Sequence, residues 1–293
     1  MMVFVRHWLL VYGLLMAAAG WAQVPGRGPV QLSIASEDVG VQVPGYWFAA
    51  SAGASLSPAV VALHGCDGLL DPKGRLGLLR LRYVQLLNDA GIGVLFIDSF
   101  SGRGEKSICS QKPTARKITE ENRRLDVYGA LKWLAGQSGV DPARLGVVGW
   151  SHGGQTVLSS ADQTEDVVKN AMVRPAALVA FYPGCTKFEK MFRYEAVAPL
   201  LVMSGELDDW TPAAPCKRLT DRLKTRAAGS PVEYLEMAGS YHAFDSSIAP
   251  RERLDVGGTR SGKATVGGNP AAREASAQAM IRFLTAQFRK VGE

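Results

Sequence analysis

The sequence predicts an α/β fold in which a mostly parallel β-sheet is covered by helices on both faces. Short apolar runs alternate with longer amphipathic stretches along the chain, and the runs are apolar throughout rather than at every second residue. With 293 residues, of which 47% are hydrophobic and 20% charged, the chain has the size and composition of one large globular domain.

The predicted strands and helices alternate along the chain. Two β-type patterns at 30–36 and 41–50 flank the turn Asp38-Val39-Gly40 and predict leading antiparallel strands. Strands of the parallel sheet are then expected at 59–63, 94–97, 145–148, 177–181, 200–203 and 232–235. Helices are expected at 76–90, 119–135, directly after Gly153, 213–227 and 271–288. Two long irregular stretches, 99–118 and 246–269, predict surface loops that border the site or simply move.

Residues 1–22 have the pattern of a secretory signal peptide, which leaves 23–293 as a single domain. The segment carries Arg6, an apolar run at 8–19 and then Gly20-Trp21-Ala22, with small residues where cleavage is expected. The alternative is a membrane anchor, but the run is shorter than the ~20 residues that span a bilayer. We therefore expect an exported protein, periplasmic or secreted, without a stable membrane span once the signal is removed.

The charge of the chain excludes one class of partner. The net charge of +6 becomes +5 when Arg6 leaves with the signal (6 − 1 = 5), and the basic residues are scattered rather than gathered on one helical face. This pattern argues against nucleic-acid binding.

The strongest indication of chemistry is Gly149-Trp150-Ser151-His152-Gly153-Gly154, a G-x-S-x-G pattern after the apolar run 145–148. A serine on a sharp strand-to-helix turn exposes its hydroxyl, and glycines two residues away let neighbouring backbone pass without a Cβ clash. A glycine-rich turn without chemistry is the alternative. The strand before the pattern and the helix after it favour Ser151 as a nucleophile.

A serine needs a base, and four histidines are available. His7 leaves with the signal, His64 ends an early strand, and His152 adjoins the serine. His242 follows the last β run and is in the chain order expected for a general base. A structural, hydrogen-bonded histidine is the alternative for His242.

The third member should be a carboxylate just beyond a strand. The run 200–203 leads into Ser204-Gly205-Glu206-Leu207-Asp208-Asp209-Trp210-Thr211-Pro212, which offers two aspartates and a glutamate. Chemistry alone does not choose among them. The spacing G-x-x-D-x-x-x-P, usual for this loop in α/β-hydrolases, favours Asp208 over Asp209, which would then be a solvated or loop-capping carboxylate.

Oxyanion donors are expected from two backbone amides. The helix after the serine offers the amide of His152. The segment His64-Gly65-Cys66-Asp67-Gly68 follows an early strand and offers the amide of Cys66. His64 itself is expected to order this loop through a hydrogen bond rather than to transfer protons.

The four cysteines would meet an oxidising compartment after export, where three pairings are possible. None lies at the G-x-S-x-G turn, and none has C-x-x-C spacing. Because Cys185 and Cys216 follow adjacent strands, we expect them to lie within bridging distance and to be paired, and likewise Cys66 with Cys109.

Six collinear segments, spread over about 55 to 290, resemble the dienelactone hydrolase family of α/β-hydrolases. They are His64-Gly65-Cys66-Asp67-Gly68, Asp98-Ser99-Phe100-Ser101-Gly102-Arg103-Gly104, Gly149-Trp150-Ser151-His152-Gly153-Gly154, Tyr182-Pro183-Gly184-Cys185, Gly205-Glu206-Leu207-Asp208-Asp209-Trp210-Thr211-Pro212 and Tyr241-His242-Ala243-Phe244-Asp245.

The resemblance implies the α/β-hydrolase fold, with a sheet of about eight strands, and acyl transfer without a cofactor or metal by Ser151, Asp208 and His242. The enzymes that gave the family its name use a cysteine where this chain has Ser151. An exported member with serine looks more like an esterase or lactonase that acts on a small-molecule ester or lactone. The alternatives are a peptidase or amidase, and a catalytically silent binding protein on the same fold.

Overall fold

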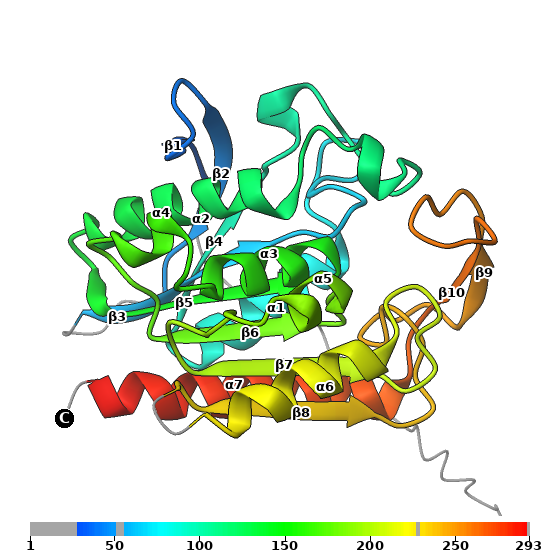
Figure 1. Cartoon of the computed structure of the whole chain (residues 1–293). Helices are drawn as coiled ribbons and strands as arrows, with labels where there is room; N and C mark the ends of the chain where they lie inside the picture. The colour runs from blue at the N-terminus through cyan, green and yellow to red at the C-terminus, as the bar shows by residue number, and fades with distance from the viewer. Residues whose placement is uncertain (1–27, 51–55, 227–228, 292–293) are drawn as a thin grey trace, which may run out of the picture.

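The computed structural model describes residues 28–50, 56–226 and 229–291, and its centre is one eight-stranded sheet (Figure 1). The expected signal peptide, 1–22, lies outside the described residues. The order across the sheet is β1-β2-β4-β3-β5-β6-β7-β8. The strands are β1 (Val30–Ala35), β2 (Gln42–Phe48), β3 (Ser57–Leu63), β4 (Gly93–Ile97), β5 (Val140–Trp150), β6 (Ala177–Phe181), β7 (Leu200–Gly205) and β8 (Val232–Met237).

The sheet is mostly parallel, as the sequence predicts. Strand β1 pairs with β2, and β2 with β4, in antiparallel fashion, whereas every pair from β4 to β8 is parallel. Helices connect the parallel strands, and a last helix follows them. They are α1 (Leu78–Asp89), α2 (Glu120–Ala135), α3 (His152–Ala161), α4 (Asp166–Lys169), α5 (Thr186–Lys190), α6 (Ala213–Lys224) and α7 (Pro270–Val291), with 3-10 turns η1 (Ser101–Arg103) and η2 (Pro113–Ala115).

Two hydrophobic cores lie on opposite faces of the sheet. Successive residues of β3 alternate between them: Val61 packs with buried residues of α2, α3 and α6, whereas Val60 packs with buried residues of α1 and α7. Burying each such apolar side chain contributes about 1.5–3 kcal/mol. Because both faces are covered, the buried runs of the central strands, such as 59–63 and 177–181, are apolar at every position, and this explains the continuous runs in the sequence.

The stretch 246–269 differs from the expected irregular loop because it contains a small hairpin. Strands β9 (Arg251–Arg253) and β10 (Ala264–Val266) pair antiparallel, and Val266 also forms a parallel bridge with His242. The hairpin lies beyond the end at which the arrow of β8 points (Figure 1). Its strands are short and half exposed, so they carry no apolar run that a sequence pattern could reveal. Within the described part of the chain, no helix is both long and apolar enough to cross a membrane.

Candidate active site

Ser151 lies on the turn between β5 and α3. Its φ of 55° and ψ of −115° are values that residues other than glycine rarely adopt. A Cβ atom at Gly149 would lie 2.2 Å from the carbonyl oxygen of Gly153, and a Cβ atom at Gly153 would lie 2.2 Å from that of Leu63. Close backbone packing therefore requires both glycines of the G-x-S-x-G pattern.

The structure brings Ser151, His242 and Asp208 into one chain of hydrogen bonds. The Oγ of Ser151 lies 2.9 Å from Nε2 of His242, and Nδ1 of His242 lies 2.8 Å from Oδ2 of Asp208. With the imidazole proton on Nδ1, the ring donates to the carboxylate and accepts from the serine hydroxyl. This arrangement can remove a proton from the serine as its oxygen attacks a carbonyl carbon.

The carboxylate of Asp208 is fixed by its own loop. Its Oδ1 accepts hydrogen bonds from the backbone N–H groups of Trp210, at 2.9 Å, and Thr211, at 2.8 Å. The Oγ1 of Thr211 lies 2.9 Å from Oδ2 of Asp208 and 3.0 Å from Nδ1 of His242. Asp208 and His242 are both buried, so these contacts hold the carboxylate in the position that faces the ring.

The other acidic residues of this loop point elsewhere. Asp209 accepts hydrogen bonds from the backbone N–H of Thr265, at 2.8 Å, and from its hydroxyl, at 3.1 Å, and so holds strand β10. Glu206 accepts a hydrogen bond from the backbone N–H of Gly239 at 2.7 Å. Of the three carboxylates between which the sequence left a choice, Asp208 is the one that contacts His242.

The two expected oxyanion donors flank Ser151. His152 is the first residue of α3, and a Cβ atom at Gly65, next to Cys66, would lie 3.5 Å from Cβ of Ser151. The carbonyl oxygen of Cys66 accepts hydrogen bonds from the backbone N–H of Ile108, at 2.8 Å, and from Oγ of Ser107, at 3.1 Å. The loop that carries Cys66 is thus held by the segment after β4.

A buried arginine that the sequence analysis did not single out joins these two segments. Arg123, on α2, is fully buried and donates one hydrogen bond to Nδ1 of His152, at 2.8 Å, and another to the carbonyl oxygen of His64, at 2.9 Å. Burial lowers the pKa of the Arg123 guanidinium to about 10. In the sequence it stands in the charged run 120–124, so it resembles a surface residue of the helix.

The two histidines beside Arg123 have structural environments. Burial, with the nearby Arg123 cation as a second cause, holds the pKa of both His64 and His152 well below the ordinary value. Nδ1 of His64 donates to the carbonyl oxygen of Gly65 at 2.8 Å, which agrees with a role in ordering the loop. The side chain of His152 points away from Ser151, toward Arg123.

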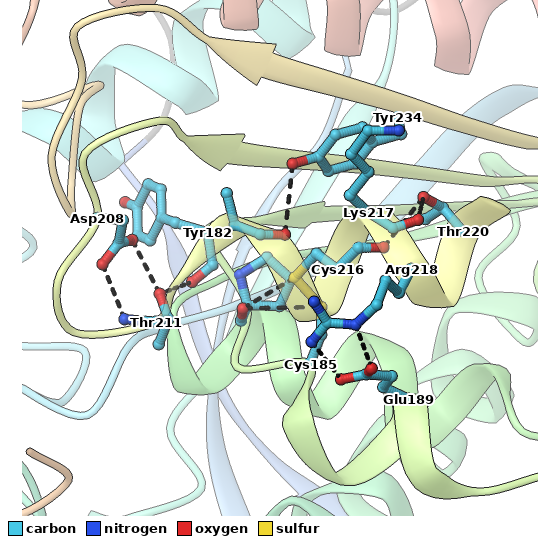
Figure 2. Close-up of a disulfide and its surroundings, with 12 residues drawn as sticks. Tyr182, Cys185, Glu189, Asp208, Thr211, Cys216, Lys217, Arg218, Thr220 and Tyr234 are labelled. Carbon is cyan, nitrogen blue, oxygen red and sulfur yellow. Dashed lines mark hydrogen bonds and ion pairs between the residues drawn. A yellow bond between two sulfur atoms is a disulfide. The ribbon is translucent and has the colours of Figure 1, made fainter.

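Both disulfides of the structure are the pairs expected from the sequence. Cys66 is bonded to Cys109, with the Cα atoms 4.9 Å apart, and Cys185 is bonded to Cys216, with the Cα atoms 5.0 Å apart. The first links the loop beside Ser151 to the stretch 99–118. Figure 2 shows the second, which joins the start of α5 to α6 near the loop of Asp208 and Thr211.

Two cavities meet at Ser151. The first has a volume of about 580 Å³ and is lined by His242 and by aromatic rings, and we call it the aromatic cavity. Its rings are those of Tyr83, Phe96, Trp150, Tyr182 and Trp210. The second has a volume of about 530 Å³ and is lined mainly by polar and charged residues, and we call it the polar cavity. These residues include Arg116, Glu120, Glu121, Gln155, Lys187 and Lys190. Cys66 and Trp210 lie at the border and line both.

Two tyrosines that line the aromatic cavity are held in place by hydrogen bonds to one buried carboxylate. Asp245 accepts hydrogen bonds from the hydroxyls of Tyr83, at 2.7 Å, and Tyr182, at 2.8 Å. The Tyr182 ring packs edge-on against His242 with ring centroids 4.8 Å apart. Phe244, which also lies near the motifs, is instead a fully buried core residue.

No cluster of three or more His, Cys, Asp or Glu side chains that could hold a metal ion occurs among the residues that the structure describes.

Comparisons with known proteins bear on the family and the fold of the chain. The sequence model of the dienelactone hydrolase family matches residues 55–288. An uncharacterized protein of Mycobacterium tuberculosis is 26% identical over 254 residues, which cover 79% of this chain and 83% of that protein.

Solved structures show the same fold. Esterase 2 of Thermogutta terrifontis, in a form phosphoramylated by tabun, matches with a TM-score of 0.62 and 15% identity, over 90% of this chain and 97% of that one. A dienelactone hydrolase-like promiscuous phosphotriesterase from metagenomic libraries matches with a TM-score of 0.61 and 17% identity, over 89% of this chain and 99% of that one. Both likenesses support the α/β-hydrolase architecture.

Proposed function

We propose that this chain, which belongs to the dienelactone hydrolase family, hydrolyses a carboxylic ester or lactone through an acyl-enzyme on Ser151. The observation that carries the proposal is the chain of hydrogen bonds from Ser151 through His242 to Asp208, at 2.9 and 2.8 Å. Membership of a hydrolase family implies a small-molecule substrate.

In the proposed cycle, Nε2 of His242 takes the proton of Ser151 as the serine oxygen attacks the carbonyl carbon. Asp208 holds the ring in the required tautomer and stabilises the imidazolium that forms. The imidazolium then gives its proton to the departing alcohol oxygen, and the acyl group remains on Ser151. A water molecule, activated by His242 in the same way, releases the acid.

The negative charge that develops on the carbonyl oxygen is stabilised by the backbone amides of Cys66 and His152. The positions of both residues beside Ser151 support this role. Each donor of this kind is worth about 10²–10³ in kcat. Because Arg123 holds both segments from behind, the two amides would be fixed before the substrate arrives.

Replacing the nucleophile tests the proposal directly. The Ser151→Ala variant should fold, as judged by circular dichroism, and should lose hydrolysis of p-nitrophenyl acetate and labelling by a fluorophosphonate probe. Ser138→Ala, which changes an exposed serine outside the two cavities at Ser151, is the matched control and should keep both. Turnover that survives in Ser151→Ala would refute the assignment.

The same reagents separate the alternatives. A catalytically silent binding protein would not react with the fluorophosphonate at Ser151. A peptidase or amidase would turn over an amide at a rate comparable with that of the matching ester, whereas we expect the ester to be strongly preferred. The ratio of the two kcat/KM values decides between them.

We also propose that the protein is exported after cleavage behind residue 22. Two disulfides are consistent with an oxidising compartment. N-terminal sequencing of the protein recovered outside the cytoplasm should begin at Gln23. Recovery of the uncleaved chain in the membrane fraction would instead support an anchor.

A further inference from the structure

We propose that the enzyme selects esters by both halves: an apolar, ring-bearing alcohol binds in the aromatic cavity, and an acyl chain with a neutral oxygen acceptor at its far end binds in the polar cavity. This inference rests on the proposed function. It adds a direction of binding and a substrate class, since the two cavities differ in chemistry and meet at the reacting serine.

The direction follows from the position of the base. The alcohol oxygen receives its proton from Nε2 of His242, so the alcohol half must lie on the side of the imidazole. His242 lines the aromatic cavity and does not line the polar cavity. The acyl half, whose bond to the reacting carbon is not broken, then extends away from the ring into the polar cavity.

The aromatic cavity is suited to an apolar alcohol. The rings of Tyr83 and Trp150 lie with centroids 4.6 Å apart, and that of Trp210 lies 4.7 Å from that of His242. Of the charged residues that line it, Arg80 is bound to Asp67 and to the carbonyl oxygen of Gly68, and the Arg253 guanidinium lies over the Trp210 ring, 5.3 Å from its centroid. An aromatic or large aliphatic alcohol gains most from such a wall, because ring contacts add to the burial of apolar surface.

The polar cavity offers hydrogen-bond donors that the protein itself does not use. Within the described part of the chain, no ion pair or side-chain hydrogen bond joins Arg116 to another residue, and its buried Nε has no acceptor. Gln155, one helical turn after Ser151, also lines this cavity, and its side-chain amide makes no hydrogen bond to a described residue. A buried donor such as Nε of Arg116 is costly unless an acceptor satisfies it, and the half-buried amide of Gln155 can bind the same ligand.

The charges around these donors favour a neutral acceptor over an anion. Lys187 pairs with Glu120 at 3.1 Å and also with Glu121, so its charge is already neutralised, and Lys190, the other lysine of this cavity, is exposed to solvent, where its charge is screened. Burial lowers the pKa of Arg116, and the nearby carboxylate of Glu120 opposes this shift only in part. An anionic acyl group would meet the same two glutamates. A ketone or amide oxygen would accept hydrogen bonds without that repulsion.

Matched esters test both parts of the proposal. The 2-naphthylmethyl esters of 4-oxopentanoate and pentanoate differ by one ketone in the acyl half. The reversed esters, 4-oxopentyl and pentyl 2-naphthoate, put the same groups on the opposite sides. We expect kcat/KM, divided by the alkaline hydrolysis rate of each ester, to be about tenfold or more higher for the oxopentanoate than for the pentanoate, as for a hydrogen bond to a charged donor. For the reversed pair, the corrected kcat/KM values of the 4-oxopentyl and pentyl esters should be similar.

A variant and its neighbour locate the effect. Arg116→Ala should reduce the ratio of oxopentanoate to pentanoate to near one, and Lys117→Ala, at an exposed adjacent position outside both cavities, should leave the ratio unchanged. Equal kcat/KM values for the two naphthylmethyl esters, a preference for the reversed esters, or a hemisuccinate that is turned over faster than the oxopentanoate would each overturn the inference.

These failures are distinguishable from failure of the proposed function. If none of the esters is hydrolysed and Ser151 does not react with the fluorophosphonate, both proposals fall. If Ser151-dependent hydrolysis occurs without discrimination between the esters, the hydrolase assignment stands and the inference about the two cavities is wrong.

Discussion

Removal of the Arg123 side chain should damage catalysis and stability together. In Arg123→Ala, Nδ1 of His152 and the carbonyl oxygen of His64 both lose their donor inside the protein. Each unsatisfied buried acceptor costs about 1–3 kcal/mol. Part of this cost is offset. Arg123 is a buried cation without a carboxylate of the described residues in direct contact, and the variant no longer has to bury that charge. We expect the free energy of unfolding to fall by about 3 kcal/mol, from a total that is typically about 5–15 kcal/mol.

The catalytic effect follows from the same two contacts. Both segments that Arg123 holds carry a proposed oxyanion donor, so kcat for p-nitrophenyl acetate should fall by about tenfold or more while KM changes little. Arg123→Lys should recover only part of the loss, because one ammonium group does not reproduce the fork that reaches both acceptors.

Arg124 provides the matched control. It is the next residue of α2 and also mostly buried, but its guanidinium binds Ser159, at 2.9 Å, and Glu165, at 2.7 Å, away from Ser151. Arg124→Ala should therefore lower the urea midpoint without lowering kcat in the folded protein. If Arg123→Ala keeps the wild-type kcat, or if Arg124→Ala loses as much, Arg123 does not act through the oxyanion donors.

Three further outcomes are expected. Asp208→Asn should lower kcat by about ten-thousandfold, as loss of the orienting carboxylate does in serine hydrolases of this type, and Asp209→Asn should leave kcat nearly unchanged; equal losses in steady-state assays would contradict the assignment. Gly153→Ala should lower kcat by about a hundredfold, because its Cβ would meet a carbonyl oxygen at 2.2 Å and displace the serine turn; a variant with wild-type kcat would show that the turn adapts. Because burial holds the pKa of His64 and His152 well below the ordinary value, the unfolded chain binds protons that the folded chain excludes, and the free energy of unfolding should fall as the pH drops below about 6.5. In His64→Gln, the free energy of unfolding, measured by urea denaturation, should fall less steeply with decreasing pH, by at most about 1.4 kcal/mol per pH unit. The same pH dependence as in the wild type would mean that His64 is protonated in the folded state.

The sequence predicted the fold class and the strand order along the chain because the central strands are buried on both faces. Runs such as 177–181 have no position at which a polar residue is tolerated, so they are recognisable without further information. The serine turn was recognisable for a related reason: close backbone packing admits only glycine at Gly149 and Gly153.

The features that the sequence did not reveal depend on contacts between distant segments. Asp208 and Asp209 are chemically identical neighbours, and they differ because one faces His242 and the other faces strand β10. Arg123 resembles a solvated cation until the packing of α2 against α3 and the loop of His64 is known. Strands β9 and β10 are held by hydrogen bonds such as those of Asp209 rather than by apolar side chains, so hydrophobic patterns cannot predict them.

The two cross-links also bear on the proposed export of this chain. They close loops of 43 and 31 residues, and each is worth about 4 kcal/mol through the lost freedom of the unfolded chain. Together they rival the whole net stability of an ordinary domain. A newly made polypeptide with four free thiols is correspondingly easy to unwind and to thread through a narrow translocation channel. Oxidation on the far side then makes the folded form difficult to reverse.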